Sequence, residues 1–114
     1  MAGPVVIAGT LYGLSNLGDG MIVPAGATTM GLVLTGIDAL NYCKTQKRTS
    51  PGGAFVDQVT YRSDQFGTKV PVTAGEEWRV AAVKLQTFNE IRYVMNAVPV
   101  TSASSDEAGS AGPA

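Results

Sequence analysis

The sequence predicts an all-β fold: a single antiparallel β-sandwich, jelly-roll-like, with extended termini. The chain of 114 residues has room for one domain with its own core. It contains 14 Gly and 6 Pro, and only 15% of its residues are charged, which argues against a helical bundle or a coiled coil. Hydrophobic residues make up 45%, enough for a packed core. Short strand-like segments recur roughly every 8 to 12 residues between Gly and Pro turns, as in sandwiches and small barrels.

The first predicted strand covers residues 5–12, which begin with β-branched side chains and include Gly9, a poor helix residue. The sequence Gly18-Asp19-Gly20 predicts a turn. A short strand follows at residues 21–23 and stops at Pro24, where Pro24-Ala25-Gly26 forms a corner.

Residues 28–44 fit both a strand pattern and a helical stripe. Gly31 and Gly36 favour strands, because each would cost a helix interior about 1 kcal/mol relative to Ala. We therefore predict strands at residues 29–34 and 39–45, with a bend at Gly36.

The second half of the chain continues the β pattern. Trp78 and Val80 are predicted to face the core, and Ile91, Tyr93 and Met95 share one face of the last strand. The predicted elements are an exposed loop at 46–54, a strand at 55–62, a turn at 63–67, a Pro and Ala-Gly corner at 70–75, and strands at 76–80, 81–86 and 91–96. The predicted core is Val33 or Leu34, Leu40 or Tyr42, Val59 or Tyr61, Trp78, Val80, Leu85, and Ile91 or Tyr93.

The chain divides into a β-sandwich domain at residues 1–100 and a tail rich in Ser, Gly and Ala at residues 101–114. The tail has no large apolar side chain to bury, so we expect it to be ordered only against another chain.

Composition excludes several classes of function. The chain has no His, which excludes imidazole bases, imidazole metal ligands and Ser-His-Asp chemistry. The net charge of -1 gives no electrostatic attraction to nucleic acid. One cysteine, Cys43, allows neither an internal disulfide nor a four-thiolate zinc site. The apolar runs are too short to span a membrane, and no basic segment precedes residues 5–8, so we expect a soluble protein without a secretory signal.

The acidic and thiol side chains offer no convincing catalytic group. Glu76 and Glu77 are neighbours on a predicted strand and therefore point to opposite faces. Asp57 shares a face with Phe55 and Val59, where it needs a partner if it is buried. Cys43 has no His to activate it and is better interpreted as a small packed hydrophobic residue. We therefore expect neither enzymatic activity nor a cofactor.

The charged residues do offer candidates for contact with a partner. Lys44, Lys47 and Arg48 form the only basic cluster, which is either a solvated loop or a contact to an acidic neighbour. The tail carries Asp106 and Glu107, so a body of net charge +1 carries a tail of charge -2. These five residues are the candidate partner contacts.

Three short segments resemble a known family. Residues 22–28 (Ile-Val-Pro-Ala-Gly-Ala-Thr), residues 39–44 and residues 71–76 (Pro-Val-Thr-Ala-Gly-Glu) precede a closing strand pair at 85–95 that ends in Arg92-Tyr93-Val94. This pattern resembles the small β-sandwich decoration, or cement, proteins of tailed bacteriophages. The resemblance covers about residues 20–96 and departs from the family in the long 46–54 loop.

The resemblance implies a structural role without catalysis or cofactor. It implies binding to the major capsid protein on the outer surface of the virion, often as trimers at threefold positions, after synthesis in the host cytoplasm. We expect such a protein to bridge neighbouring capsid subunits. The alternative is a carbohydrate- or receptor-binding module of a phage tail or adhesin, with Trp78, Tyr12, Tyr42 and Tyr61 as stacking surfaces. Burial of Trp78 would remove the platform that this alternative needs.

Overall fold

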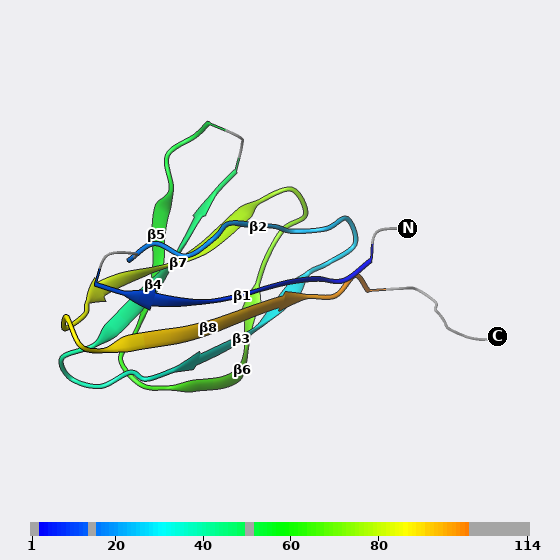
Figure 1. Ribbon diagram of the computed structural model, residues 1–114. Helices are drawn as coiled ribbons and strands as arrows, with labels where there is room; N and C mark the ends of the chain where they lie inside the picture. Colours follow the sequence, from blue (N-terminus) through cyan, green and yellow to red (C-terminus); the bar gives the residue numbers. More distant parts are fainter. Residues whose placement is uncertain (1–2, 14–15, 50–51, 101–114) are drawn as a thin grey trace.

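The computed structural model describes residues 3–13, 16–49 and 52–100, which form eight strands and no helix. Two four-stranded antiparallel sheets pack face to face, so the predicted β-sandwich is confirmed (Figure 1). The strands are β1 (Val5–Tyr12), β2 (Met21–Ile22), β3 (Thr29–Thr35), β4 (Tyr42–Arg48), β5 (Val56–Tyr61), β6 (Gln65–Pro71), β7 (Glu77–Lys84) and β8 (Glu90–Ala97).

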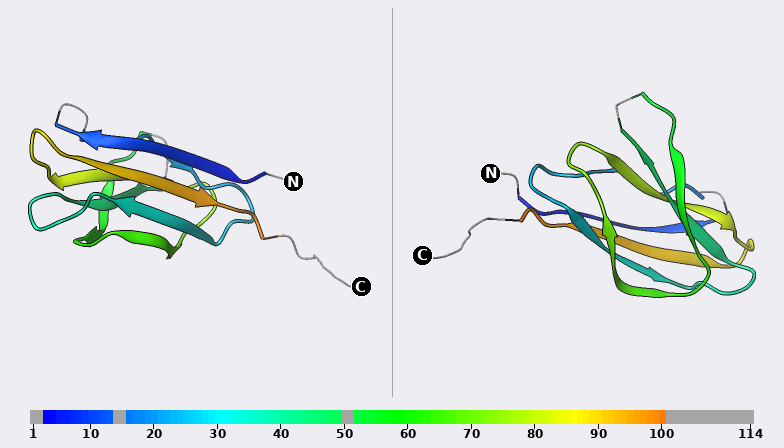
Figure 2. Two further views of the ribbon diagram at one scale, coloured as in Figure 1. Left: turned by 60° about the horizontal axis from the view of Figure 1, so that its bottom comes forward. Right: turned by 180° about the vertical axis from the view of Figure 1, so that it is seen from behind.

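The strand order is that of a jelly roll. Sheet 1 has the order β1-β8-β3-β6 and sheet 2 the order β2-β7-β4-β5. Successive strands cross between the sheets, except at the β4–β5 hairpin. Eight strands arranged as two interleaved Greek keys define this fold. The strands of sheet 1 lie side by side in the left view of Figure 2, with β1 at the edge.

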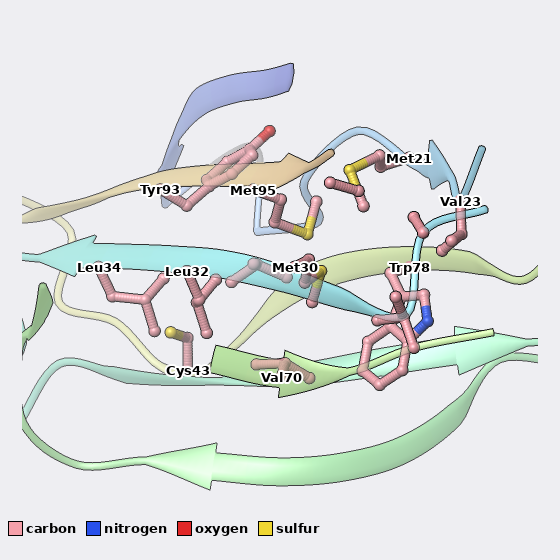
Figure 3. Packing of buried hydrophobic residues seen from close by; sticks show 14 of the residues in the cluster. Met21, Val23, Met30, Leu32, Leu34, Cys43, Val70, Trp78, Tyr93 and Met95 are labelled. Atoms are coloured by element: carbon pink, nitrogen blue, oxygen red, sulfur yellow. The ribbon is translucent and has the colours of Figure 1, made fainter. Parts of the chain in front are cut away.

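The core lies between the sheets and follows the two-residue alternation of the strands. In β3 the side chains of Met30, Leu32 and Leu34 point inward and have no exposed surface (Figure 3). Each such side chain contributes roughly 1.5 to 3 kcal/mol by leaving water. The predicted core residues Leu34, Trp78, Val80, Ile91 and Tyr93 are buried, and Leu85 packs against them half-buried.

In the two predicted alternatives, Leu40 (45%) and Val59 (48%) are exposed, whereas Tyr42 is half-buried and Tyr61 packs against the core half-buried. Leu40 lies in a turn rather than in a strand, because its N–H donates to Asp38 Oδ1 (2.8 Å) and the Asp38 N–H donates to the Asn41 carbonyl (2.8 Å). The predicted strand at 39–45 is therefore wrong at its start, since β4 begins at Tyr42.

Other predicted boundaries also change. β4 continues to Arg48, so the first three residues of the predicted 46–54 loop pair with β7. β6 falls where the sequence predicted a turn and a corner; it is an edge strand, which tolerates Pro71 at its end and Gly67 beside a register shift. The predicted strands at 76–80 and 81–86 are one continuous strand, β7.

The two predicted corners lie against each other. Val23 N–H donates to the Glu76 carbonyl (2.8 Å), and Gly75 N–H donates to the Val23 carbonyl (2.9 Å). Gly26 and Gly75 have φ of 87° and 89°, which only glycine adopts without strain. The Val100 N–H donates to the Gly26 carbonyl (2.9 Å), so the described chain ends at this corner.

Residues 18–20 do not form the predicted turn. Gly18 N–H instead donates to the Val80 carbonyl (2.7 Å), and Asp19 N–H donates to Tyr93 Oη (3.0 Å). A Cβ on Gly18 would lie 2.9 Å from Tyr93 Cζ, and one on Gly9 would lie 2.5 Å from Tyr93 Oη. These two glycines are therefore required for close packing around the Tyr93 ring.

Candidate interaction surface

The basic cluster predicted from the sequence lies on β4, and each of its side chains has an intramolecular carboxylate partner. Lys44 Nζ lies 2.9 Å from Asp57 Oδ2 on β5. Lys47 Nζ lies 2.9 Å from Glu76 Oε2, and Arg48 Nη2 lies 2.6 Å from Glu77 Oε1. The cluster is thus neutralised by adjacent strands.

Glu76 is a buried carboxylate at the end of the sandwich. Its Oε1 accepts from the Thr73 N–H (2.7 Å) and from Trp78 Nε1 (3.2 Å), while Lys47 holds Oε2. Burial opposes ionisation of Glu76, but the hydrogen bonds from Lys47, Thr73 and Trp78 outweigh it and lower the pKa of the carboxyl below its ordinary value. Glu76 therefore has a structural role, and it points away from Glu77 as predicted.

The outer face of sheet 2 carries a continuous polar network. Arg48 Cζ and Arg79 Cζ lie 4.7 and 3.8 Å from the centre of the Phe55 ring. Arg79 Nε donates to Gln46 Oε1 (2.9 Å), and Nε2 of Gln46 donates to Asp57 Oδ1 (2.8 Å). The hydrogen bonds from Gln46 and then Lys44 lower the pKa of Asp57. The sequence left open whether Asp57 is buried on the face of Phe55 and Val59. The structure shows that Asp57 is exposed and that Lys44 and Gln46 are its partners.

Cys43 is buried in the core, and burial raises the pKa of its thiol to about 12. It is a packed hydrophobic residue, as predicted. Among residues 3–13, 16–49 and 52–100, no three His, Cys, Asp or Glu side chains gather as metal ligands would. The same part of the chain contains no helix long and apolar enough to cross a membrane.

The aromatic side chains do not form a stacking platform. Trp78 is 2% exposed and its ring lies in the core (Figure 3). Lys47 Nζ lies 5.5 Å from the centre of this ring. Tyr42 lies under Arg62, 4.1 Å from ring centre to Cζ, and Tyr61 packs against the core. Of the four aromatics considered from the sequence, only Tyr12 is exposed.

The outer face of sheet 1 carries an apolar row that the sequence did not predict. Ala8 pairs with Val94, Val94 with Val33, and Val33 with Phe66, so these four side chains cross all four strands on one face. Phe66 is 77% exposed, Ala8 is exposed, and the two valines are half-buried. We call these four residues the apolar row.

The rows on either side of the apolar row contain polar and charged residues as well as Val6. In the adjacent row, Val6 pairs with Asn96, Asn96 with Gly31, and Gly31 with Lys69. Val6 is 56% exposed. On the other side lies Arg92, which is paired with Glu90 (3.1 Å). The outer face of sheet 1 thus carries one apolar row flanked by polar and charged residues, and the outer face of sheet 2 carries the polar network.

Two of the five candidate contacts, Asp106 and Glu107, lie outside the described residues. Phe66 was missed because its segment was predicted to be a turn; only its cross-strand partner Val33 places it on the face.

Comparison with models of protein families, with characterised proteins and with solved structures finds no match.

Proposed function

We propose that this chain is a structural protein that binds the outer surface of a bacteriophage capsid and stabilises it by bridging neighbouring major capsid protein subunits. The observation that carries the proposal is the apolar row across the outer face of sheet 1. A flat face with an exposed aromatic side chain at one end is suited to contact with another protein surface. The proposed role includes no catalytic step and no cofactor.

Two further observations support the proposal. The jelly-roll order recurs in viral capsid and lectin domains, although a fold by itself does not define a function. The charges on β4 are paired within the chain, so Lys44, Lys47 and Arg48 reach an outside partner only by exchanging their present carboxylates. The apolar row has no such competing partner among the residues that the structure describes. Asp106 and Glu107 remain proposed contacts to another chain.

Stabilisation follows from mass action. A protein that binds only the assembled shell stabilises it by RT ln(1 + [L]/Kd) per site. When one copy of this protein bridges two capsid subunits, a subunit leaves the shell only after its contact with the bridging protein is broken. The free energy of that contact therefore adds to the stability of the shell. The resemblance further implies groups of copies at threefold positions, which is a proposal that the symmetry of the decorated particle tests.

The experiment is reconstitution on purified phage particles. Particles stripped of this protein are incubated with wild-type chain or with Phe66→Lys, and occupancy is measured by sedimentation and gel densitometry. We expect Phe66→Lys to lose most of its occupancy, because it places a charge in the apolar row. Phe88→Lys is the matched control: Phe88 is 97% exposed at the β7–β8 turn, away from the row, and its variant should bind normally.

The same particles test the stabilising role. Those carrying wild-type chain should release their DNA at a higher temperature than stripped particles. Failure of the wild-type chain to associate with the particles in a fixed ratio to the major capsid protein would overturn the proposal. Equal occupancy of wild type and Phe66→Lys would overturn the assignment of the surface. The carbohydrate-binding alternative is not supported by the buried position of Trp78.

A further inference from the structure

The described strands leave four sheet edges: β1 and β6 in sheet 1, and β2 and β5 in sheet 2. An edge strand directs every second N–H and C=O away from its neighbour, ready to pair with another strand. Proteins protect such edges with charged side chains, proline, register shifts or short strands. An edge strand without such protection is therefore a candidate site for pairing with a strand of another chain.

Three of the four edges carry such protection. β2 has only two residues and Pro24 follows closely. β5 carries Asp57 and pairs with β4 through a register shift. β6 carries Lys69 and Pro71, and its pairing with β3 also shifts.

Strand β1 itself carries none of them, although Pro4 directly precedes its first residue. Its eight residues, Val-Val-Ile-Ala-Gly-Thr-Leu-Tyr, include no charge and no proline. All eight pair with β8 in one unbroken register. Within the described part of the chain, β8 is also the only strand with which β1 pairs, and none of the backbone hydrogen bonds of turns and loops involves it. Counting only partners among the described residues, alternate residues of β1 therefore present unpaired backbone groups on the side away from β8.

We propose that β1 pairs, antiparallel and about a two-fold axis, with β1 of a second copy of this chain. An uncharged strand is complementary to itself, since no like charges meet when it pairs with its own copy. The other segment available for an edge is residues 101–114, whose Gly, Pro, Ser, Asp and Glu residues disfavour strands. A second copy satisfies both unprotected edges at once.

The alternation of β1 restricts the register of this pair. For both sandwiches to lie on the same side of the joined sheet, even-numbered residues must face even-numbered residues. Over the length of β1 this centres the pair on Ala8 or on Gly9. In the Ala8 register, the apolar row of one copy continues directly into that of the other.

The pairing of two β1 strands is independent of the proposed function. What the pairing means for contact with a capsid, through the outer face of sheet 1, rests on the proposed function. Strands lie about 4.8 Å apart and residues about 3.3 Å apart along a strand, so the face of a sheet of four strands with about eight residues each has an area of roughly 500 Å². A standard protein interface buries about 800 Å² per partner. One sheet 1 face falls below that area, and the joined eight-stranded face exceeds it. A two-fold contact can also link copies at neighbouring threefold positions of a shell.

The test is the mass of the purified full chain in solution, by sedimentation equilibrium over a range of concentrations. We expect a particle of twice the 11.8 kDa of one chain. Ala8→Lys places like charges opposite or diagonal to each other across the pair, and should raise the dimer dissociation constant about tenfold or more. Ala8→Glu is the second edge variant and should act in the same direction, because the two carboxylates meet at the same position. Circular dichroism verifies that each variant is folded.

Asn96→Lys is the matched control. Asn96 lies on the same face, directly opposite Val6 but one strand further from the axis. The two new charges would then lie roughly 20 Å apart in the Ala8 register and farther apart in the Gly9 register, beyond the screening length of about 8 Å at physiological salt. Asn96→Lys should therefore remain dimeric. A monomeric or trimeric wild type would overturn the proposal, as would equal weakening by Ala8→Lys and Asn96→Lys, which would indicate face-to-face association. Because no shell is present, none of these outcomes depends on capsid binding.

Discussion

Replacement of Trp78 tests the described core most directly. Trp78 is the largest buried side chain, 2% exposed, and it lies on β7 opposite Met21 of β2 and Lys47 of β4. Trp78→Ala removes its burial and leaves a cavity between the sheets, which together cost about 3 to 5 kcal/mol. Domains of this size are stable by about 5 to 15 kcal/mol, so the variant should fold with a much reduced margin.

A second variant separates packing from hydrogen bonding. Trp78→Phe keeps an aromatic ring in the core but removes the indole N–H that donates to Glu76 Oε1. A hydrogen bond to a charged group is worth about 1.5 to 3 kcal/mol, and Glu76 keeps Thr73 and Lys47 as donors. Trp78→Phe should therefore lose less than Trp78→Ala, and the difference between the two variants measures the packing of the aromatic ring that Phe keeps.

The assay is urea unfolding followed by far-ultraviolet circular dichroism, because Trp78 is the only tryptophan and its removal abolishes the usual fluorescence signal. In thermal melts each kcal/mol lowers Tm by about 4 to 8 °C for a domain of this size. The control is Phe88→Ala, at an exposed position, which should stay within about 0.5 kcal/mol of wild type. A Trp78→Ala loss below about 1 kcal/mol would refute the described burial and restore Trp78 as a candidate ligand-binding residue.

Three other predictions follow from the packing and the charges. Folding lowers the pKa of Glu76, so the ionised carboxylate stabilises the fold above the ordinary pKa of 4.5, and this stabilisation is lost as the pH falls through the folded-state pKa. Glu76→Gln should therefore lose less stability to urea on acidification than wild type. Parallel curves of stability against pH for the two proteins would contradict this assignment. Gly9→Ala should cost about 1 to 3 kcal/mol by forcing a Cβ against Tyr93, whereas Gly31→Ala, with its nearest neighbour 3.9 Å away, should be nearly neutral; equal melting temperatures for the two would show that the Tyr93 contact is not tight. Deletion of residues 102–114 should leave Tm nearly unchanged but lower occupancy on phage particles, and full occupancy would show that Asp106 and Glu107 are not contacts.

The strands were predictable where one face is buried and the other is not. In β3 and β8 the alternation of large apolar and polar residues is strong, and both strands were predicted to within one residue at each end. β6 was missed because an edge strand needs little apolar sequence and tolerates the Gly and Pro that normally mark turns. The turn at residues 38–41 was missed because Asp38 organises it through side-chain hydrogen bonds, which compete with strand pairing.

The candidate contacts were harder to predict than the fold. Clustering along the chain identified Lys44, Lys47 and Arg48, but their partners come from β5, from the first residue of β7 and from Glu76 just before it. These pairs depend on cross-strand register, which short sequence patterns do not contain. The apolar row depends on register as well, since Ala8, Val33, Phe66 and Val94 are far apart in the chain and meet only through the ladders of sheet 1.

The distribution of charge over the two sheets connects the fold to its proposed role. Sheet 2 places Arg48, Arg79 and Lys44 on its outer face and holds them with carboxylates, an amide and an aromatic ring, an arrangement that suits a surface facing water. Sheet 1 has both the apolar row and the unprotected β1 edge. A chain selected only to remain monomeric would be expected to protect that edge and to place a charge within the apolar row. Because both features occur on the same sheet, the two proposals fit one mode of assembly: the proposed pairing through β1 would join two apolar rows, and the joined face would be the surface proposed to contact the capsid.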